Sequence, residues 1–270
     1  MKIQRVRERV VVRSGGDIAT GTIFRLHQCG YRVLVLETSN PTAIRRTVSF
    51  SQAIFDGEME IEDVVAVRCE SLEDAQHIIE QNKIPVMVDS EGKCIPQYKP
   101  KLVVDGILAK KNLGTSKDMA PIVVGLGPGF YAGKDVHAVI ETHRGHELGR
   151  VIYEGPALPN TGIPGVIGGR ESERVNYSPA DGKIIVYKDI ESLVKEGEVI
   201  ASVEGKPVVA QIDGMVRGMI QHGTTVFKGM KIADVDPRGE KVNCKTISDK
   251  ARSIAGGVLE AFLHLDLKIK

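Results

Sequence analysis

The chain has 270 residues, 42% of them hydrophobic and 26% charged, a composition typical of soluble globular proteins with one large or two ordinary domains. Its 36 Lys and Arg residues against 35 Asp and Glu residues leave a formal net charge of +1, and Trp is absent. This balance of charges argues against binding to nucleic acid or to an anionic membrane through a strongly basic surface. We therefore expect no nucleic-acid or membrane partner.

Apolar runs stay below the roughly 18 residues that a membrane helix needs, and the basic N-terminal stretch lacks the apolar core of a signal peptide. The four cysteines are scattered without metal-type spacing: Cys29, Cys69, Cys94 and Cys244. We expect a cytoplasmic protein with reduced thiols. Cys94, in the loop-like stretch EGKCIP, is the thiol to examine for reactivity.

The first 150 residues alternate β-branched runs with helical patterns. Strands are predicted at 10–13, 31–37, 64–68, 85–89, 102–106 and 121–127, and helices at 18–30, 41–55 and 71–82. In the first helix Ile18, Ile23, Leu26 and Cys29 share one face. This alternation predicts an α/β fold over residues 1–152, a Rossmann-like domain with a mostly parallel sheet and crossover helices.

Beyond residue 152 the pattern changes. Residues 153–175 are rich in Gly and Pro and predict a linker, whereas residues 176–238 are β-rich. Asp181–Ile184 lies 32 positions before Asp213–Val216, and Val194–Ile200 lies 32 positions before Val226–Ile232. A constant offset for two sub-motifs predicts two similar β units that pack face to face.

The last segment, 239–270, contains a predicted helix over 248–265 with a serine cap. We expect this helix to pack back on the first domain. Gly256 and Gly257 in its middle lower its stability, and they indicate either a close helix approach or a break.

The first strand ends in the run Ser14–Asp17 (SGGD), which partly matches the dinucleotide fingerprint G-x-G-x-x-G/A. Gly16 and Ala19 occupy two of the fingerprint positions, and Glu37 ends the next strand 20 residues after Asp17. Asp17 would cap the helix but would also repel a pyrophosphate. Two interpretations stay open, a plain strand-to-helix turn and a nucleotide or other phosphate site.

A second glycine-rich loop follows the predicted strand 121–127 and should emerge at the carboxyl edge of the sheet, where ligands of open α/β sheets bind. Its candidate ligand-binding residues are Gly125, Gly127, Gly129, Lys134 and Arg144. Arg144 and Arg150 suit a phosphate or carboxylate. The alternative is a metal site built from His143, His146, Glu141 and Glu147, but Gly145 argues against the regular helix that it needs and no further ligand is identifiable, so no metal is predicted.

Other charged residues lie at predicted strand ends without forming a motif. They are Arg45, Arg46, Asp105, Lys110 and Lys111. Solvated faces explain most such charges, so these residues enter no predicted site.

Four stretches together resemble a known family: residues 13–37, 45–58, 125–155 and 233–239, the last reading ADVDPRG. They are similar to the selenium-dependent molybdenum hydroxylase accessory proteins of the YqeB type, over residues 8 to 265. The resemblance implies a role in maturing or loading molybdenum hydroxylases of the xanthine dehydrogenase type. Where the family has Gly-Ala-Gly-Asp, this chain has Ser14–Asp17, and where the family tends to have Asp-x-Arg it has Asp105–Ile107.

Residues 176–238 resemble biotinyl/lipoyl-type domains, which are barrel-sandwich hybrids. In such carriers the modified lysine lies in the hairpin that joins the halves, where this chain has Lys206. The flanking Gly205 and Pro207 depart from the carrier signature, which favours a structural module over a carrier.

Together these features predict an accessory factor that binds a phosphate-bearing ligand, a nucleotide or molybdopterin, at the Rossmann edge. The site would comprise Gly15, Gly16, Asp17, Glu37, Gly125, Gly127, Gly129, Lys134 and Arg144. Two alternatives stay open. One is an NAD(P)-dependent oxidoreductase in which Glu37 binds the ribose hydroxyls, and the other is a non-catalytic scaffold that docks partners.

Overall fold

A computed structural model describes residues 8–160, 162, 169–170 and 172–269. The chain forms two compact units. The first unit draws on residues 1–41, 49–160 and 247–270, and the second on residues 42–48 and 161–246. Each unit is described by itself.

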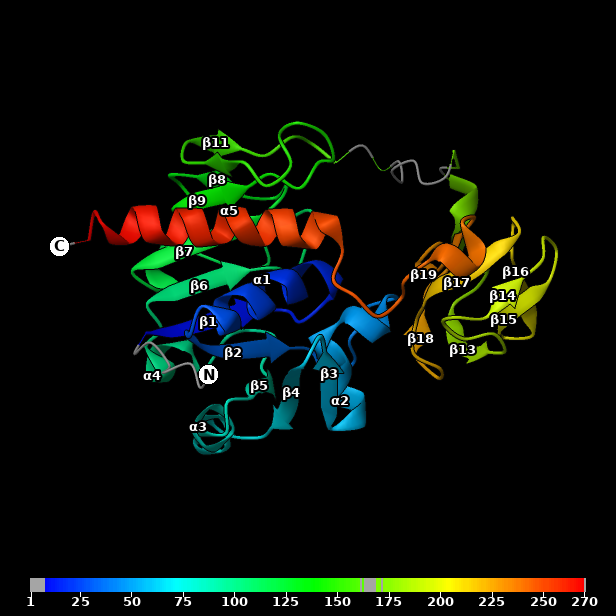
Figure 1. The fold of residues 1–270 in the computed structure, drawn as a ribbon, viewed down its shortest axis with the longest axis horizontal. Helices are drawn as coiled ribbons and strands as arrows, with labels where there is room; N and C mark the ends of the chain where they lie inside the picture. Colours follow the sequence, from blue (N-terminus) through cyan, green and yellow to red (C-terminus); the bar gives the residue numbers. More distant parts are fainter. Residues whose placement is uncertain (1–7, 161, 163–168, 171, 270) are drawn as a thin grey trace. The chain divides into compact units, whose positions relative to one another are not determined.

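The first unit is built on a nine-stranded sheet in the order β10-β9-β7-β6-β1-β2-β5-β4-β3 (Figure 1). The strands are β1 (Arg9–Arg13), β2 (Arg32–Glu37), β3 (Glu58–Ile61), β4 (Val64–Cys69), β5 (Ile84–Val88), β6 (Leu102–Asp105), β7 (Ile122–Leu126), β9 (Ala138–Ile140) and β10 (Val151–Ile152). Only the outermost pairings, of β3 with β4 and of β10 with β9, are antiparallel. The predicted α/β class with a mostly parallel sheet is confirmed.

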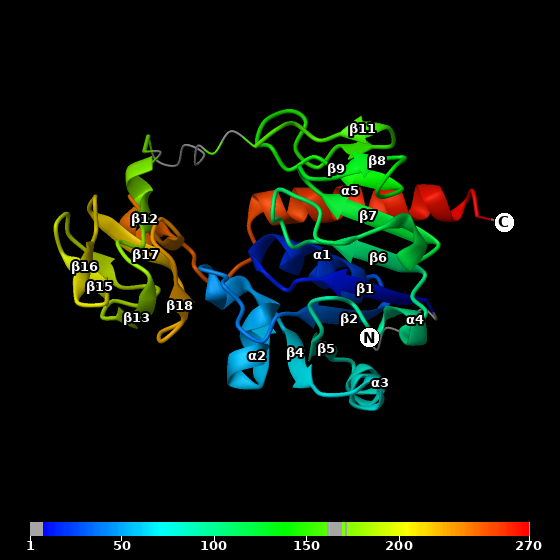
Figure 2. The same ribbon diagram turned by 180° about the vertical axis from the view of Figure 1, so that it is seen from behind.

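Helices cover both faces of this sheet. On one face α1 (Asp17–Gln28) and α5 (Asp249–Asp266) pack over alternate residues of β1 such as Val10 and Val12. On the other face α3 (Leu72–Glu80) and α4 (Ile95–Tyr98) pack over Val11. Figures 1 and 2 show these faces from opposite sides. A short ribbon of β8 (Tyr131–Ala132) and β11 (Gly155–Pro156) completes the unit.

The C-terminal helix α5 lies against α1 at a close approach. A Cβ on Gly21 of α1 would come within 2.6 Å of the Ala251 carbonyl oxygen, and a Cβ on Gly257 would collide with the carbonyl oxygen of Gly149. The helix runs unbroken through Gly256 and Gly257. The expected break at these glycines is therefore wrong, and Gly257 is required because α5 closely approaches the turn at Gly149 rather than another helix.

Residues 41–55 do not form the predicted helix. They contain only η1 (Arg46–Val48), η2 (Phe50–Gln52) and the start of α2 (Ala53–Asp56). Residues 42–48 belong to the second unit, where the Ile44 carbonyl accepts a hydrogen bond from the Met219 N–H at 2.7 Å. This tertiary pairing replaces the helical hydrogen bond. Cys29 is also exposed at the C-cap of α1, rather than on its buried face.

The second unit consists of two four-stranded antiparallel sheets, in the orders β12-β19-β17-β14 and β16-β15-β13-β18. Their strands are β12 (Val175–Tyr177), β13 (Gly182–Val186), β14 (Leu193–Val194), β15 (Val199–Val203), β16 (Lys206–Val209), β17 (Gly214–Met219), β18 (Thr225–Val226) and β19 (Lys231–Asp236). Short turns η4 (Ser172–Arg174) and η5 (Gly239–Lys241) flank them.

The offset of 32 residues relates the pairing of these strands. β13 pairs Ile184 with Val203 of β15, and β17 pairs Val216 with Val235 of β19. The same offset exchanges the pair β12–β19 with β16–β15 and the pair β13–β18 with β17–β14. All four named residues share one hydrophobic core. The second unit is therefore internally two-fold in its pairing.

The predicted linker 153–175 includes residues 161, 163–168 and 171, which lie outside the described residues. Its first part holds β11 and its last part holds η4. Within the described ranges, no helix has the length and apolar character required to cross a membrane.

Candidate functional site

The candidate site lies at the carboxyl edge of the nine-stranded sheet. Chain order reverses between β1 and β6, which are parallel neighbours at its centre. Ligands of open α/β sheets bind outside the carboxyl ends at such a reversal. Both glycine-rich loops singled out in the sequence leave strands at this edge, one after β1 and one after β7.

In the first loop the backbone donors are already used. The Gly15 N–H donates to Glu37 Oε2 at 2.8 Å, and the Gly16 N–H donates to the Ser14 hydroxyl at 3.2 Å. The other oxygen of Glu37 accepts from the Thr38 N–H at 2.8 Å. Glu37, 7% exposed, therefore holds the loop closed from the end of β2.

Packing explains Gly15 in the first loop. A Cβ on Gly15 would lie 2.7 Å from the Ser51 backbone nitrogen, which donates to the Gly15 carbonyl at 2.9 Å. Ser14 has φ +79°, so it occupies the left-handed region at the fingerprint position that usually carries glycine. Its hydroxyl also donates to Glu37 at 3.2 Å. Side-chain hydrogen bonding thus offsets the missing glycine.

The glycines of the second loop are close-packed as well. A Cβ on Gly125 would overlap the Phe130 ring, and one on Gly127 (φ +74°) would press on the Thr142 side chain. A Cβ on Gly129 (φ +115°) would lie 2.7 Å from the Lys111 backbone nitrogen. Protein atoms fill the space beside each of these three glycines, so they shape the edge instead of cradling a ligand in this conformation.

Lys134 lies at the opposite edge of the sheet. It precedes β9, which starts at Ala138 and runs parallel to β7, so residues 133–137 lie at the amino edge. Lys117, which precedes β7, donates to the Gly133 carbonyl at 2.7 Å. The structure therefore does not bring Lys134 together with the two glycine loops.

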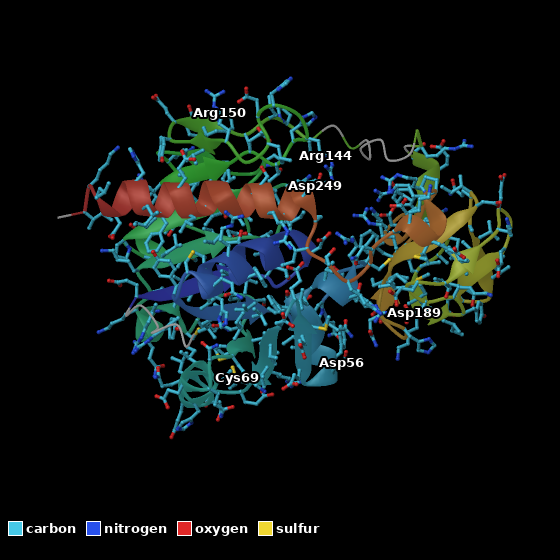
Figure 3. The ribbon with its side chains drawn as sticks, in the orientation of Figure 1. Asp56, Cys69, Arg144, Arg150, Asp189 and Asp249 are labelled. Carbon is cyan, nitrogen blue, oxygen red and sulfur yellow. The ribbon has the colours of Figure 1, made fainter. Side chains whose placement is uncertain are left out.

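Arg144 does lie at the carboxyl edge, beyond β9. Its two terminal nitrogens donate to the Asp249 carboxylate at 3.0 and 3.3 Å. Figure 3 shows both residues beside the first turn of α5. The pair is exposed, so the guanidinium can exchange this partner for another anion at small cost.

The two acids of the alternative metal site are engaged elsewhere. The buried Glu141 accepts hydrogen bonds from the N–H groups of Thr142 and His143 at 2.7 Å and of Leu158 at 2.8 Å. Glu147 pairs with Arg150. The Glu141 carboxylate thus serves to order the chain after β9.

Lys250, in the first turn of α5, is the residue that sequence analysis missed. It is half-buried, and within the described part of the chain its ammonium makes no hydrogen bond or ion pair. Burial, and next the charge of Arg144, lower its pKa below the usual value, against the opposing effect of Asp17, Glu141 and Asp249. A lysine in the first turn of a helix, where the dipole disfavours positive charge, was the available signal.

A second missed residue is Arg13, the last residue of β1. It is 2% exposed and pairs with Asp105, which is 1% exposed at the end of β6. Both residues stand at the reversal of chain order. Burying the two charges costs desolvation free energy, which the ion pair and its hydrogen bonds offset.

Cys94 does not have the character of a reactive thiol. Burial, together with a hydrogen bond and the charge of Asp89, raises its pKa to about 12. The thiolate is the reactive form, so Cys94 is largely protonated at neutral pH.

In the second unit, Lys206 is exposed and begins β16 directly after the turn at Glu204 and Gly205. Arg46 donates to the Met219 carbonyl at 2.8 Å and pairs with Asp189, both within the same unit. These residues form no cluster with a buried polar group.

The second unit has its own buried charges on β19. Asp234 pairs with Arg174 at 2.8 Å, and Asp236 pairs with Arg238 at 2.7 Å, while Arg217 lies within 4 Å of both acids. Although burial opposes the change, Arg238 lowers the pKa of Asp236. Both buried acids of β19 are therefore paired with arginines of the same unit.

The chain matches no family model. It is 52% identical over 256 residues to the uncharacterized protein YqeB of Escherichia coli strain K12, a match that covers 95% of the chain and 47% of YqeB. The chain thus spans about half the length of this curated relative. Among solved structures, a succinylglutamate desuccinylase/aspartoacylase from Rhodobacter sphaeroides aligns at 14% identity with TM-score 0.27, covering 84% of each chain. An aspartoacylase family protein from Mesorhizobium loti aligns at 11% identity with TM-score 0.26 and the same coverage.

Proposed function

The chain belongs to the YqeB family, and on this premise we propose that it is an accessory factor in the maturation of selenium-dependent molybdenum hydroxylases. In this role it binds a phosphate-bearing ligand, a nucleotide or molybdopterin, at the carboxyl edge of the nine-stranded sheet. Its protein partner is a molybdenum hydroxylase of the xanthine dehydrogenase type, met in the cytoplasm. The motifs quoted from residues 13–37 and 125–155 support this pathway.

The proposal includes a finer description of both units. The first is a Rossmann-like domain, supported by the reversal of strand order between β1 and β6. The second is a barrel-sandwich hybrid, supported by the two-fold exchange of strand pairs at an offset of 32 residues.

The observation that carries the ligand-binding part is the amine of Lys250 at the carboxyl edge, which has no hydrogen bond or ion pair to the residues that the structure describes. Burying an ammonium without a partner is unfavourable, and an anionic ligand would remove that penalty. Arg144, whose charge reaches Lys250, adds a guanidinium that suits phosphate or carboxylate. The ligand site is therefore centred on Lys250 and Arg144, while the glycine loops shape the edge around them.

An NAD(P)-dependent oxidoreductase is less well supported. That function requires Glu37 to bind ribose hydroxyls, yet both its oxygens hold backbone N–H groups, of Gly15 and of Thr38. A ribose would have to displace these bonds. The scaffold alternative, which needs no small ligand, is an outcome of the experiment below.

Isothermal titration of the whole chain with ATP, NAD, pyrophosphate and isolated molybdopterin tests the site. We expect binding of at least one phosphate compound, weakened about 10-fold or more in Lys250→Met, because a charge-assisted bond is lost. Lys134→Met, at the amino edge, is the matched control and should bind as the unmodified chain does.

Equal binding by Lys250→Met and the unmodified chain would remove the site from this edge. No binding of any of the four compounds, together with capture of a molybdenum hydroxylase by the chain, would favour the scaffold alternative. Failure to capture the hydroxylase or to raise its activity on co-expression would contradict the maturation role.

A further inference from the structure

The segment between β6 and β7 crosses the carboxyl edge from one face of the sheet to the other. Residues 106–116 contain no helix or strand. Near its start Leu108 packs against the core beneath α1 and α5. Near its end Thr115 reaches Arg13, whose side chain alternates with Val12 and so lies on the opposite face. The segment therefore covers the ends of the two strands at which chain order reverses.

Two hydrogen-bonded groups hold the far end of this segment, the Thr115 hydroxyl and, at 3.5 Å from Arg13, the Leu113 carbonyl. The Thr115 hydroxyl donates to Asp105 Oδ2 at 2.6 Å and accepts from the Arg13 guanidinium. Asn112 pairs with the backbone of Thr115 through both atoms of its amide, each at 2.8 Å. Arg13 also donates to the carbonyl of Ser90 at 2.9 Å. The Arg13 guanidinium thus contacts a neutral hydroxyl, that of Thr115, as well as the Asp105 carboxylate and the Ser90 carbonyl.

The segment is closed at the cost of local strain. Leu108 has φ +58° and Lys110 has φ +62°, a conformation that L side chains rarely adopt. Arg13 Nε, although buried, has no hydrogen-bond partner in the described residues. In the observed conformation the segment therefore has a strained backbone, and the buried Arg13 Nε beside it lacks a hydrogen bond to the described residues.

We propose that residues 107–115 form a lid over the carboxyl edge, latched by Thr115, and that an anionic ligand displaces Thr115 from Arg13 as the lid opens. Phosphate and carboxylate oxygens match the fork of a guanidinium better than a single hydroxyl does. Arg13 would then supply the ligand with a cation from the end of β1. This inference rests on the proposed function for the identity of the ligand as an anion, but the latch itself does not.

Hydrogen exchange measured by mass spectrometry on the whole chain tests the latch without any ligand. Thr115→Val keeps the shape and removes the hydroxyl, and we expect peptide 106–116 to exchange about 5-fold faster. Thr115→Ser restores the hydroxyl and should exchange as the unmodified chain does. Ser116→Ala, at an exposed neighbour whose hydroxyl caps nothing, is the matched control.

Unchanged exchange of 106–116 in Thr115→Val would overturn the lid. If exchange is also faster in Thr115→Ser, or in the β1 peptide 9–13, the latch is rejected, because such exchange reflects a general loosening of the unit. Faster exchange of peptide 106–116 in Thr115→Val alone supports the latch.

Pyrophosphate titration then tests the displacement. We expect Thr115→Val to bind pyrophosphate about 3-fold more tightly than the unmodified chain, because the Thr115 hydroxyl no longer competes with the ligand for Arg13. Equal or weaker binding in that variant would overturn the displacement. Weaker pyrophosphate binding in Lys250→Met together with unchanged binding in Thr115→Val would leave the proposed function intact and reject the displacement. Absence of pyrophosphate binding in the unmodified chain would also reject the displacement, and the titrations with ATP, NAD and molybdopterin would then decide the proposed function.

Discussion

The two units use buried charge in opposite ways. In the second unit each buried acid of β19 is paired with an arginine of the same unit. In the first unit Lys250 is half-buried at the sheet edge with no hydrogen bond or ion pair to the described residues. A charge that is matched locally serves the fold, whereas an unmatched one is a cost to the fold that a ligand can offset. The comparison predicts opposite effects of removing charge in the two units.

The largest expected effect is in the second unit. Asp236→Asn removes a fully buried carboxylate charge from Arg238 and Arg217, and should lower the free energy of unfolding by about 3 kcal/mol. Because the folded pKa of Asp236 is lowered, this stabilisation is present above the unfolded pKa of about 3.9 and is lost as pH falls below it. Urea unfolding of the variant and the unmodified chain at pH 7 and pH 3 measures the loss of stability and its dependence on pH. Glu191→Gln, at an exposed pair with Lys245 in the same unit, is the control and should change the free energy of unfolding little.

A smaller effect is expected where α5 is held in place. Gly257→Ala puts a methyl group against the Gly149 backbone, and should lower the free energy of unfolding by about 2 kcal/mol. Gly256→Ala meets only the end of the Arg25 side chain, at 3.7 Å, so it should raise stability by about 0.5–1 kcal/mol. The two adjacent alanine variants, compared by thermal unfolding, separate packing from helix propensity. Equal effects would mean that α5 does not approach the chain at Gly149.

The smallest effect has the opposite sign. Lys250→Met should raise the free energy of unfolding by up to about 1 kcal/mol at pH 7, because a half-buried amine without a partner is removed. The folded pKa of Lys250 is lowered, so the unfolded chain binds the proton more tightly and the unmodified protein gains stability as pH rises toward about 10.4. The difference between the two proteins should shrink between pH 7 and pH 10. If Lys250→Met instead lowers the free energy of unfolding, Lys250 stabilises the fold as the charges of the second unit do, and the proposed difference between the two units is wrong.

Sequence patterns predicted most of the first unit because its strands are buried runs of β-branched residues. The predicted strands at 10–13, 64–68 and 121–127 match β1, β4 and β7 to within a residue. The predicted helix at 41–55 was wrong, since the Ile44 carbonyl pairs with Met219, far away in sequence. Local periodicity carries no information about such a partner.

The candidate site was less accessible to sequence reasoning. Spacing singled out Glu37 as a ligand-binding residue, but the sequence does not show that its carboxylate oxygens accept hydrogen bonds from the N–H groups of Gly15 and Thr38. The roles of Lys250 and Arg13 could not be read from the sequence, because their partners and neighbours come from segments distant along the chain. Contacts of that kind arise only from the tertiary fold.

The strand pairing of the second unit also bears on its ancestry. Each sheet contains strands from both halves, since β12 and β14 of the first half flank β17 and β19 of the second, and β16 and β18 flank β13 and β15. Neither half can complete a sheet by itself. A single half would therefore have folded only as an interlocked homodimer, and a gene duplication that joined two such copies would yield the present unit.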